Sequence, residues 1–308
     1  MDSIRITALE ELYRVTTASL GRDGILNNPE ERFSRILRAP ITSTEVLRNF
    51  IQRSGLTFVP ESNVGKDADI VAETVKMKTV RARRYSSAIV YDSKAMNGND
   101  PKGYIKDMAE LHRISAAETM NYISETAILD GSSSVLSTMD GKSIFNNAHV
   151  AGTTTYSNLT AGALTAANLI SALSVLNSEL NTKGMPTAAA SMKFNLLVNS
   201  KKSTEADVLA NSILQPGSNY NDNFKVVTAR LGDVVSMRYW QYAGAGADNR
   251  WALTPADKMK NPWIMVVTQS PETNVTPEGR NGLQYSVIKF EVAVDCLVHF
   301  GNFGGGIA

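Results

Sequence analysis

Side chains able to do chemistry are scarce in this sequence of 308 residues, which holds three histidines and one cysteine. His149 follows a polar stretch, residues 146–148. A general base there would need a nucleophile beside it, such as Ser143 or Ser157, and no spacing in the sequence predicts that contact. We therefore expect a protein that is not an enzyme, and we keep a serine/histidine hydrolase as the alternative from another functional class.

The remaining histidines and the cysteine fit structural roles. His112 falls on the apolar stripe of a predicted long helix, where a packed histidine is far commoner than a ligand. His299 is predicted on the polar face of a final strand, with no second ligand at metal spacing. Cys296 lies between Val294 and Val298 and is predicted to be a small core residue. These positions predict no catalytic residue and no metal site.

Glycine and aspartate motifs do not change this expectation. Gly244 and Gly246 lack the third glycine and the following helix of a dinucleotide-binding turn. Asp67 and Asp69 form too short a segment for a calcium loop, which needs more oxygen donors. We expect no cofactor.

One basic cluster, formed by Arg81, Arg83 and Arg84, stands out in the sequence. Strand alternation places Arg81 and Arg83 on one side, where they could pair with carboxylates of a neighbouring subunit or face phosphates. A solvated strand face is the plainer alternative, because exposed ion pairs contribute little. We favour a contact between subunits.

Bulk composition limits the possible classes. The net charge is only +1, which argues against a dedicated nucleic-acid binder but permits weak, non-specific contact with DNA. A single cysteine excludes an intrachain disulfide and suits a reducing compartment. No apolar run reaches the roughly 18 residues of a membrane span, so no membrane partner is expected.

An extended hairpin is predicted over residues 56–92, with its tip near residues 63–69. Along residues 70–79 apolar and polar side chains mix on both faces, so neither face is apolar throughout. A two-stranded hairpin is marginal alone in water, so it needs another surface, such as a neighbouring subunit.

Other elements flank this hairpin. Residues 1–40 are predicted to be an extended arm with short helices, and residues 42–54 a short helix. Asp100 and Pro101 are typical of a helix start, and Gly131 of a helix end, so the segment between them predicts a helix roughly 45 Å long.

The rest of the chain predicts a mixed α+β region. Further helices are expected at residues 165–181 and 203–214. Strands are expected at residues 194–198, 225–228, 236–242, 251–254, 263–268 and 288–298, the last with Phe290, Val292, Val294, Cys296 and Val298 on one side.

This order of elements resembles the tailed-phage major capsid (major head) proteins of the HK-ninety-seven fold. The resemblance covers most of residues 55–308. It is carried by DIVAE at 69–73, VRARRYSSAIVYD at 80–92 and LDG at 129–131. Mu-type head subunits are similar in FNNAH at 145–149, SNL at 157–159, LTAAN at 164–168, and GMP at 184–186 followed by FNLLV at 194–198.

The resemblance implies an α+β fold with an N-terminal arm, an extended β-hairpin loop, a spine helix in a peripheral domain, and an α+β axial domain. The implied boundaries are 1–40 for the arm; 41–55, 93–135 and 270–308 for the peripheral domain, with the spine helix at 100–130; 56–92 for the hairpin loop; and 136–269 for the axial domain. The implied subunit-interface residues of the hairpin are Lys66, Asp67, Asp69, Glu73, Lys76, Lys78, Arg81, Arg83 and Arg84.

The implied function is self-assembly into an icosahedral shell of hexamers and pentamers around double-stranded phage DNA. Further implied partners are scaffolding, portal and decoration proteins. The implied location is the virion, after assembly in the host bacterial cytoplasm. An encapsulin-like compartment that encloses cargo enzymes is the alternative with the same fold.

Overall fold

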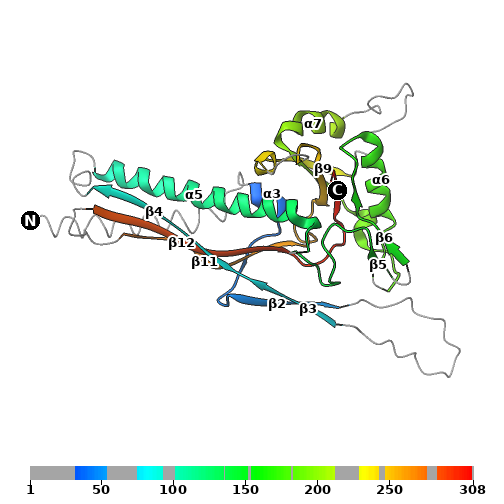
Figure 1. Cartoon of the computed structure of the whole chain (residues 1–308), viewed down its shortest axis with the longest axis horizontal. Helices are drawn as coiled ribbons and strands as arrows, with labels where there is room; N and C mark the ends of the chain where they lie inside the picture. The colour runs from blue at the N-terminus through cyan, green and yellow to red at the C-terminus, as the bar shows by residue number, and fades with distance from the viewer. Residues whose placement is uncertain are drawn as a thin grey trace, which may run out of the picture.

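A computed structural model of the chain describes residues 32–53, 75–92, 101–134, 136–151, 154–181, 183–211, 229–242, 247–275 and 283–306. In this part of the chain the molecule is elongated (Figure 1). A long helix runs beside a long sheet, and a more compact region with further helices lies at one end.

The long sheet has four strands in the order β1-β11-β12-β4. Its strands are β1 (Ile41–Thr42), β11 (Trp263–Val275), β12 (Leu283–Cys296) and β4 (Arg83–Asp92). The pairs β11–β12 and β12–β4 are antiparallel, with Val266 opposite Ala293 and Phe290 opposite Tyr85. Because β12 is central, the clearest alternation of the sequence lies at the middle of this sheet.

The predicted spine helix is confirmed as α5 (Pro101–Leu129), which continues into a short 3-10 helix, η2 (Asp130–Ser132). Its residues Met120 and Ile128 are fully buried, and His112 bonds through Nε2 to Ser286 Oγ of β12 at 2.7 Å. Gly131 is required for packing, because a Cβ there would lie 2.6 Å from a ring carbon of Phe145.

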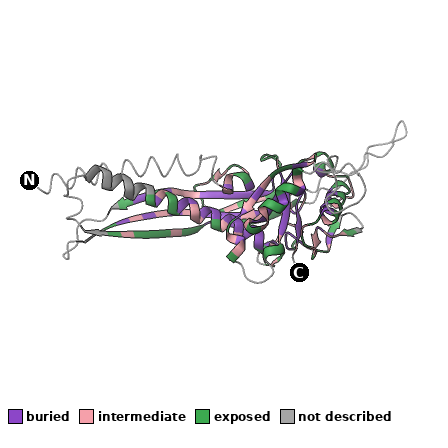
Figure 2. Cartoon of the chain, turned by 90° about the horizontal axis from the view of Figure 1, so that it is seen from above, coloured by how far each residue is buried: buried purple, intermediate pink, exposed green. Residues whose placement is uncertain are grey.

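The sheet is buried on both faces near the compact end (Figure 2). Phe290 and Val292 of β12 join the core under α5. Ala293 faces the other way and joins a smaller core with Val80 and Ile264. When both faces of a sheet are covered, the side chains on both faces of its strands are apolar. This explains why all five residues of β11 from Trp263 to Val267 are apolar.

A second sheet of five strands lies in the compact region, in the order β7-β13-β10-β8-β9. The strands are β7 (Leu159–Thr160), β13 (Phe303–Gly305), β10 (Trp251–Pro255), β8 (Phe194–Asn199) and β9 (Leu231–Met237). Helices α6 (Ala166–Asn177) and α7 (Ser203–Asn211) pack with this sheet around a separate core. The predicted strands at 194–198 and 251–254 and the helix at 203–214 are confirmed where the structure describes them, and the helix predicted at 165–181 ends earlier, at Asn177.

The predicted helix at residues 42–54 is wrong. This segment contains a strand, β2 (Leu47–Arg53), which pairs antiparallel with β3 (Val75–Arg81). Phe50 faces the protein body, while Leu47 and Ile51 face solvent on the other side of the strand. The side chains therefore alternate with the two-residue period of a strand. The sequence alone did not show the partner strand that decides between the two periods.

Two other strands differ from the prediction. The segment 236–242 leaves β9 at Met237 and forms a 3-10 helix, η5 (Tyr239–Tyr242). Strand β12 ends at Cys296, so Val298 and His299 lie outside it. The strand expected at 225–228 lies outside the described residues.

A buried carboxylate joins three parts of the chain near the C-terminal end of α5. Glu125 accepts hydrogen bonds from Arg32 Nε of α3 (Arg32–Ile36) at 2.8 Å and from the backbone N–H of Tyr239 at 2.6 Å. Its backbone carbonyl accepts from Trp240 Nε1 at 2.8 Å. Burial raises the pKa of Glu125, and the hydrogen bond from Arg32 opposes that shift.

We predict that Glu125→Ala lowers the free energy of unfolding by about 3–5 kcal/mol, because it leaves the Arg32 Nε–H and the Tyr239 N–H without their buried acceptor. Urea unfolding of the unassembled subunit measures this. Glu118→Ala is the matched control: its side chain is 38% exposed and also contacts Arg32, so it should cost about 1 kcal/mol or less. Equal losses in the two variants would contradict the central role of Glu125.

Candidate functional sites: an exposed ribbon and a buried histidine cluster

The two-stranded ribbon β2–β3 lies against the body of the protein with one face only (Figure 1). Phe50 packs against the small core on that side. Lys78 donates to Asp295 Oδ1 at 2.5 Å and to the Cys296 carbonyl at 2.9 Å, at the end of β12. An ion pair with both side chains largely buried therefore fixes the ribbon to the long sheet.

The opposite side of the ribbon is exposed and carries four large apolar side chains, with the polar pair Asn49 and Thr79 between them. We call it the ribbon face and define it by Leu47, Ile51, Val75 and Met77, which are 52%, 67%, 57% and 65% exposed. Ile51 lies directly opposite Met77 in the strand register. Large apolar side chains concentrated on one strand pair are typical of a surface that another molecule covers.

The predicted interface residues divide into three groups. Lys66, Asp67, Asp69 and Glu73 lie outside the described residues. Lys76 and Lys78 are on the inner face, and Lys78 is engaged within the chain. Arg81, Arg83 and Arg84 are exposed.

Arg81, at the end of β3, and Arg83, at the start of β4, both line one pocket beside α5. Asp130 and Asp295 also line this pocket. The pocket therefore combines cationic and anionic side chains, as a contact with a partner of mixed charge would require.

A second feature, not predicted from the sequence, is a buried polar cluster in the compact region. A tight turn between Ser137 and Ser143 begins it, and Gly141 has a φ of +79° that favours glycine. Within this turn Asp140 Oδ1 accepts a short hydrogen bond from Thr138 Oγ1 and another from the Lys142 N–H at 3.1 Å. The turn thereby directs the other oxygen, Oδ2, into the protein.

Two histidines meet that oxygen. His149 begins β5 (His149–Ala151), and its Nδ1 lies 2.7 Å from Asp140 Oδ2. Its Nε2–H donates to the Ile144 carbonyl at 3.1 Å. His299 stacks on His149 with ring centroids 3.8 Å apart, and its Nδ1 is 3.3 Å from the same oxygen.

The electrostatics of the cluster are uneven. Burial would raise the pKa of Asp140, but hydrogen bonds from His149 and Thr138 outweigh it and hold the pKa well below its usual range. Burial, helped by the nearby His149, lowers the pKa of His299 to about 3. Within the described structure neither ring nitrogen of His299 has a hydrogen-bond partner, although the ring is almost fully buried.

A buried glutamate adjoins the histidines. Glu179 accepts from the Gly301 N–H at 2.9 Å, Thr187 Oγ1 at 3.0 Å and Tyr156 Oη at 3.1 Å. Tyr156 lies opposite His149 in the pair β5–β6, where β6 is Thr154–Tyr156. Burial raises the pKa of Glu179 to about 7, although the hydrogen bonds from these three donors oppose the shift.

The structure corrects the prediction for His299 and disfavours the hydrolase. His299 is buried beside Asp140 and His149, because the chain turns inward after Cys296. Ser143 and Ser157 donate their hydroxyl groups to backbone carbonyls two residues ahead, and neither bonds to His149. His112 and Cys296 are confirmed as buried residues, and burial raises the pKa of the Cys296 thiol.

The sequence did not predict that Asp140, His149 and His299 lie together, because 150 positions separate His149 from His299 and no spacing rule spans such a distance. The burial of Asn158 is likewise not predictable from the residues around it in the sequence. Its side chain is fully buried and donates to the carbonyls of Ile144 and Asn302 at 2.8 and 3.1 Å. The chain end is thus tied to the same region as the histidines.

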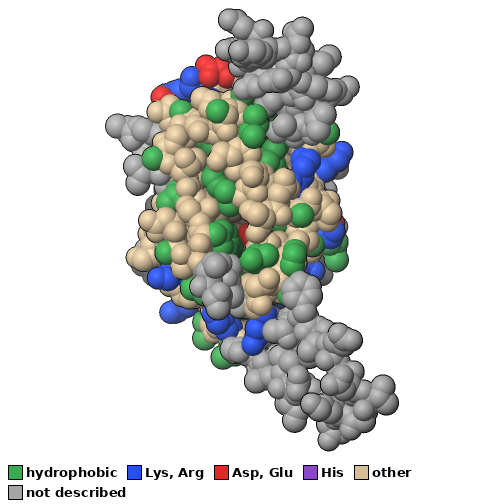
Figure 3. Space-filling view, turned by 90° about the vertical axis from the view of Figure 1, so that its right-hand side faces the viewer, with side chains coloured by type: hydrophobic (Ala, Val, Ile, Leu, Met, Phe, Trp, Pro, Cys, Tyr) green, Lys and Arg blue, Asp and Glu red, His purple; other side chains and the backbone are tan. Residues whose placement is uncertain are grey.

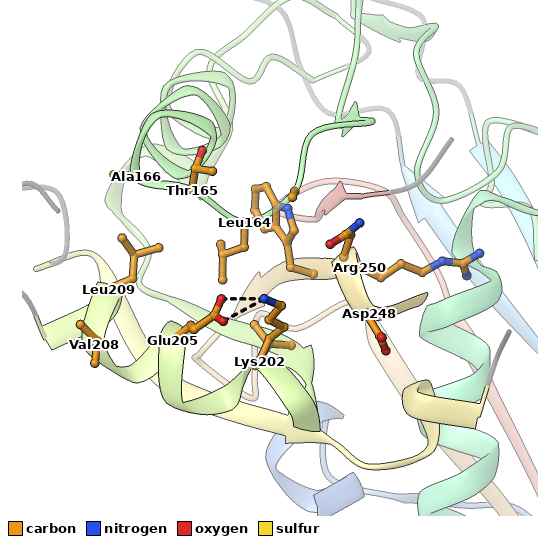
Figure 4. A pocket seen from close by; sticks show the side chains of 13 residues that line it. Leu164, Thr165, Ala166, Lys202, Glu205, Val208, Leu209, Asp248 and Arg250 are labelled. Atoms are coloured by element: carbon orange, nitrogen blue, oxygen red, sulfur yellow. Dashed lines mark hydrogen bonds and ion pairs between the residues drawn. The ribbon is translucent and has the colours of Figure 1, made fainter. Parts of the chain in front are cut away.

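The compact end also has an open pocket between α6, α7 and β10 (Figure 4). Lys202 points toward Glu205 and pairs with it at 2.8 Å, so its charge is compensated. Seen from this end, the described surface is mostly uncharged, with lysine and arginine near its margins (Figure 3). This surface does not resemble the basic groove of a protein that grips nucleic acid.

Comparison with protein families gives one match, to a family described as phage capsid protein, over residues 75–303. No curated protein sequence matches the chain. No described helix is long and apolar enough to cross a membrane.

Solved capsid structures share the fold. The mature capsid of bacteriophage PhiM1 has a TM-score of 0.52 at 12% identity, covering 89% of this chain and 86% of that one. A structure from Mycobacterium phage Patience has 0.52 at 13%, covering 96% and 87%. The capsid of Cyanophage P-SCSP1u has 0.54 at 11%, covering 89% and 86%. The predicted α+β, HK-ninety-seven-like capsid fold is confirmed.

We predict that Glu179 makes subunit stability fall as pH rises. Its folded pKa of about 7 lies above the ordinary value of 4.5, so folding retains a proton that the unfolded chain releases. Its contribution is full below pH 4.5 and is lost as pH rises to 7, by about 3 kcal/mol. Urea unfolding of wild type and Glu179→Gln across this range measures it.

The free-energy difference between those two proteins should change with pH, while Glu205→Gln, an exposed control, should follow the wild type throughout. A constant difference between wild type and Glu179→Gln would show that Glu179 has an ordinary pKa.

Proposed function

Because the chain belongs to the phage capsid protein family, we propose that it is a major capsid subunit whose ribbon face binds a neighbouring copy of the same chain. The observation that carries this proposal is the ribbon face itself, four large apolar side chains left in water on a ribbon that is fixed by its other side. A monomer gains nothing from that arrangement, whereas an assembled shell would bury these side chains.

The fixed inner side makes the ribbon suitable for assembly. Lys78 and Phe50 hold its inner face on the body, so little ordering is needed when a partner arrives. Arg81 and Arg83, near the end of the ribbon face, would then pair with carboxylates of the neighbour and set its orientation. The remaining predicted interface residues, Lys66, Asp67, Asp69, Glu73, Lys76 and Arg84, belong to the same proposal.

The domain division given above stays a prediction, with two adjustments that strand pairing supports. Strand β2 pairs with β3, so residues 47–53 belong with the hairpin loop rather than with the peripheral domain. We also assign residues 263–269 to the peripheral domain, because β11 pairs with β12 along this length.

The proposed shell is icosahedral and encloses double-stranded DNA. The net charge of +1 supports this content, because a container should not hold a packaged polymer tightly. Assembly in the host cytoplasm, and scaffolding, portal and decoration partners, are part of the same proposal, and the Mu-type features remain a prediction. Electron microscopy and extraction of nuclease-protected nucleic acid test it, and co-purified cargo enzymes would instead favour the encapsulin-like alternative.

We predict that Met77→Asp blocks assembly without unfolding the subunit. Met77 is 65% exposed, so its replacement should change the free energy of unfolding by no more than about 0.5 kcal/mol. In an interface the buried, unpaired carboxylate should weaken each contact by several kcal/mol. Size-exclusion chromatography and negative-stain microscopy measure the yield of shells.

Met259→Asp is the matched control, because Met259 is 70% exposed but lies in the turn between β10 and β11 and is not part of the ribbon. It should assemble as the wild type does. Normal shells from Met77→Asp would exclude the ribbon face as an interface, and equal failure of both variants would show that its effect is not specific.

A further inference from the structure

We propose that Asp140, His149 and His299 form a binding site for a divalent transition-metal ion, with zinc as the preferred species. The site is independent of the proposed assembly, since all three side chains belong to one subunit. Their donor atoms, one carboxylate oxygen and two imidazole nitrogens, lie within 4.8 Å of one another. Two imidazoles and a carboxylate suit zinc and its neighbours in the first transition row.

The distances are close to those of a chelate. A tetrahedral zinc ion with bonds of about 2.1 Å holds its ligand atoms about 3.4 Å apart. His299 Nδ1 is already 3.3 Å from Asp140 Oδ2, and His149 Nδ1 is 2.7 Å away. Entry of an ion therefore requires His149 to retreat by about 0.7 Å from that oxygen.

The groups behind the donors have the arrangement that metal ligands need. His149 Nε2–H donates to the Ile144 carbonyl, which leaves Nδ1 as the nitrogen that faces Asp140. Asp140 Oδ1 is occupied by Thr138 and by the Lys142 N–H, which leaves Oδ2 for the ion. Such outer partners fix the orientation of a metal ligand before the ion arrives.

His299 is the observation that points to a missing partner. Its side chain is 3% exposed, and within the described structure neither ring nitrogen makes a hydrogen bond. A buried polar group without a partner is costly, and a metal ion would supply one to Nδ1.

Besides the retreat of His149, binding requires the ion to replace the proton that His149 Nδ1 donates to Asp140 Oδ2, which passes to water, and the two rings to reorient. The two rings are nearly parallel, with an interplanar angle of 15°, whereas imidazole lone pairs lie in the ring planes and must converge on the ion. The rings must therefore splay apart about their Cα–Cβ and Cβ–Cγ bonds. Three protein donors leave the fourth position to a water molecule, and the bound ion would tie the 137–143 turn, β5 and the C-terminal segment together.

Cobalt titration of the full chain tests this proposal. Protein is dialysed against a chelator and then against buffer, and Co²⁺ is added while visible absorption is recorded. We expect one equivalent of Co²⁺ per chain, the intense absorption typical of four-coordinate cobalt, its loss when Zn²⁺ is added, and a higher unfolding temperature with Zn²⁺. Wild-type protein that binds no stoichiometric Co²⁺ would overturn the proposal.

Variants locate the site. His299→Asn should weaken Co²⁺ binding at least about 100-fold, since loss of an outer-shell partner alone costs roughly 10- to 100-fold. Thr138→Val keeps the side-chain shape and should weaken binding about 10-fold through Asp140, so it decides the matter if His299→Asn does not fold. His112→Gln, at a buried histidine bonded to Ser286, is the control and should bind normally. Unchanged affinity in both His299→Asn and Thr138→Val would place the metal elsewhere and refute the site.

Discussion

The position of Glu125 inside the spine helix is the constraint on which the rest of the structure depends. A buried carboxylate must be paired, and here its partners come from α3 and from the segment after β9. The helix is thereby fixed to the arm on one side and to the compact region on the other. Since β12 packs under the same helix, the long sheet takes its orientation from it as well.

The ribbon is exposed as a consequence of this packing. Helix α5 covers one face of the long sheet, and the inner face of β2–β3 covers part of the other. Nothing in the described chain is left to cover Leu47, Ile51, Val75 and Met77. The fold thus covers the apolar side chains on both faces of the long sheet and leaves those of the ribbon face uncovered. A subunit of a shell is expected to leave such a surface for a neighbouring molecule.

Local signals in the sequence predicted the elements well where they were strong. The Asp100–Pro101 start and the helical stripe identified α5, and strict alternation identified β12. Strand β2 was mistaken for a helix, because Val46, Leu47, Phe50 and Ile51 fit both periods and only pairing with β3 decides between them. The histidine cluster could not be predicted at all, because its members are brought together by the tertiary fold and the chain's inward turn after Cys296.

If the ribbon face is the proposed interface, its size also accounts for a stable particle built from weak contacts. Four side chains, each about half exposed, would contribute roughly 3–5 kcal/mol when a neighbour covers them, before the cost of association is subtracted. Once that cost is subtracted, this contact alone would not hold two subunits together, so a pair would part readily. In a closed shell each subunit both gives and receives such a contact, and the contacts act together. Misplaced subunits can then leave during growth, whereas the completed shell is held by all of its contacts at once.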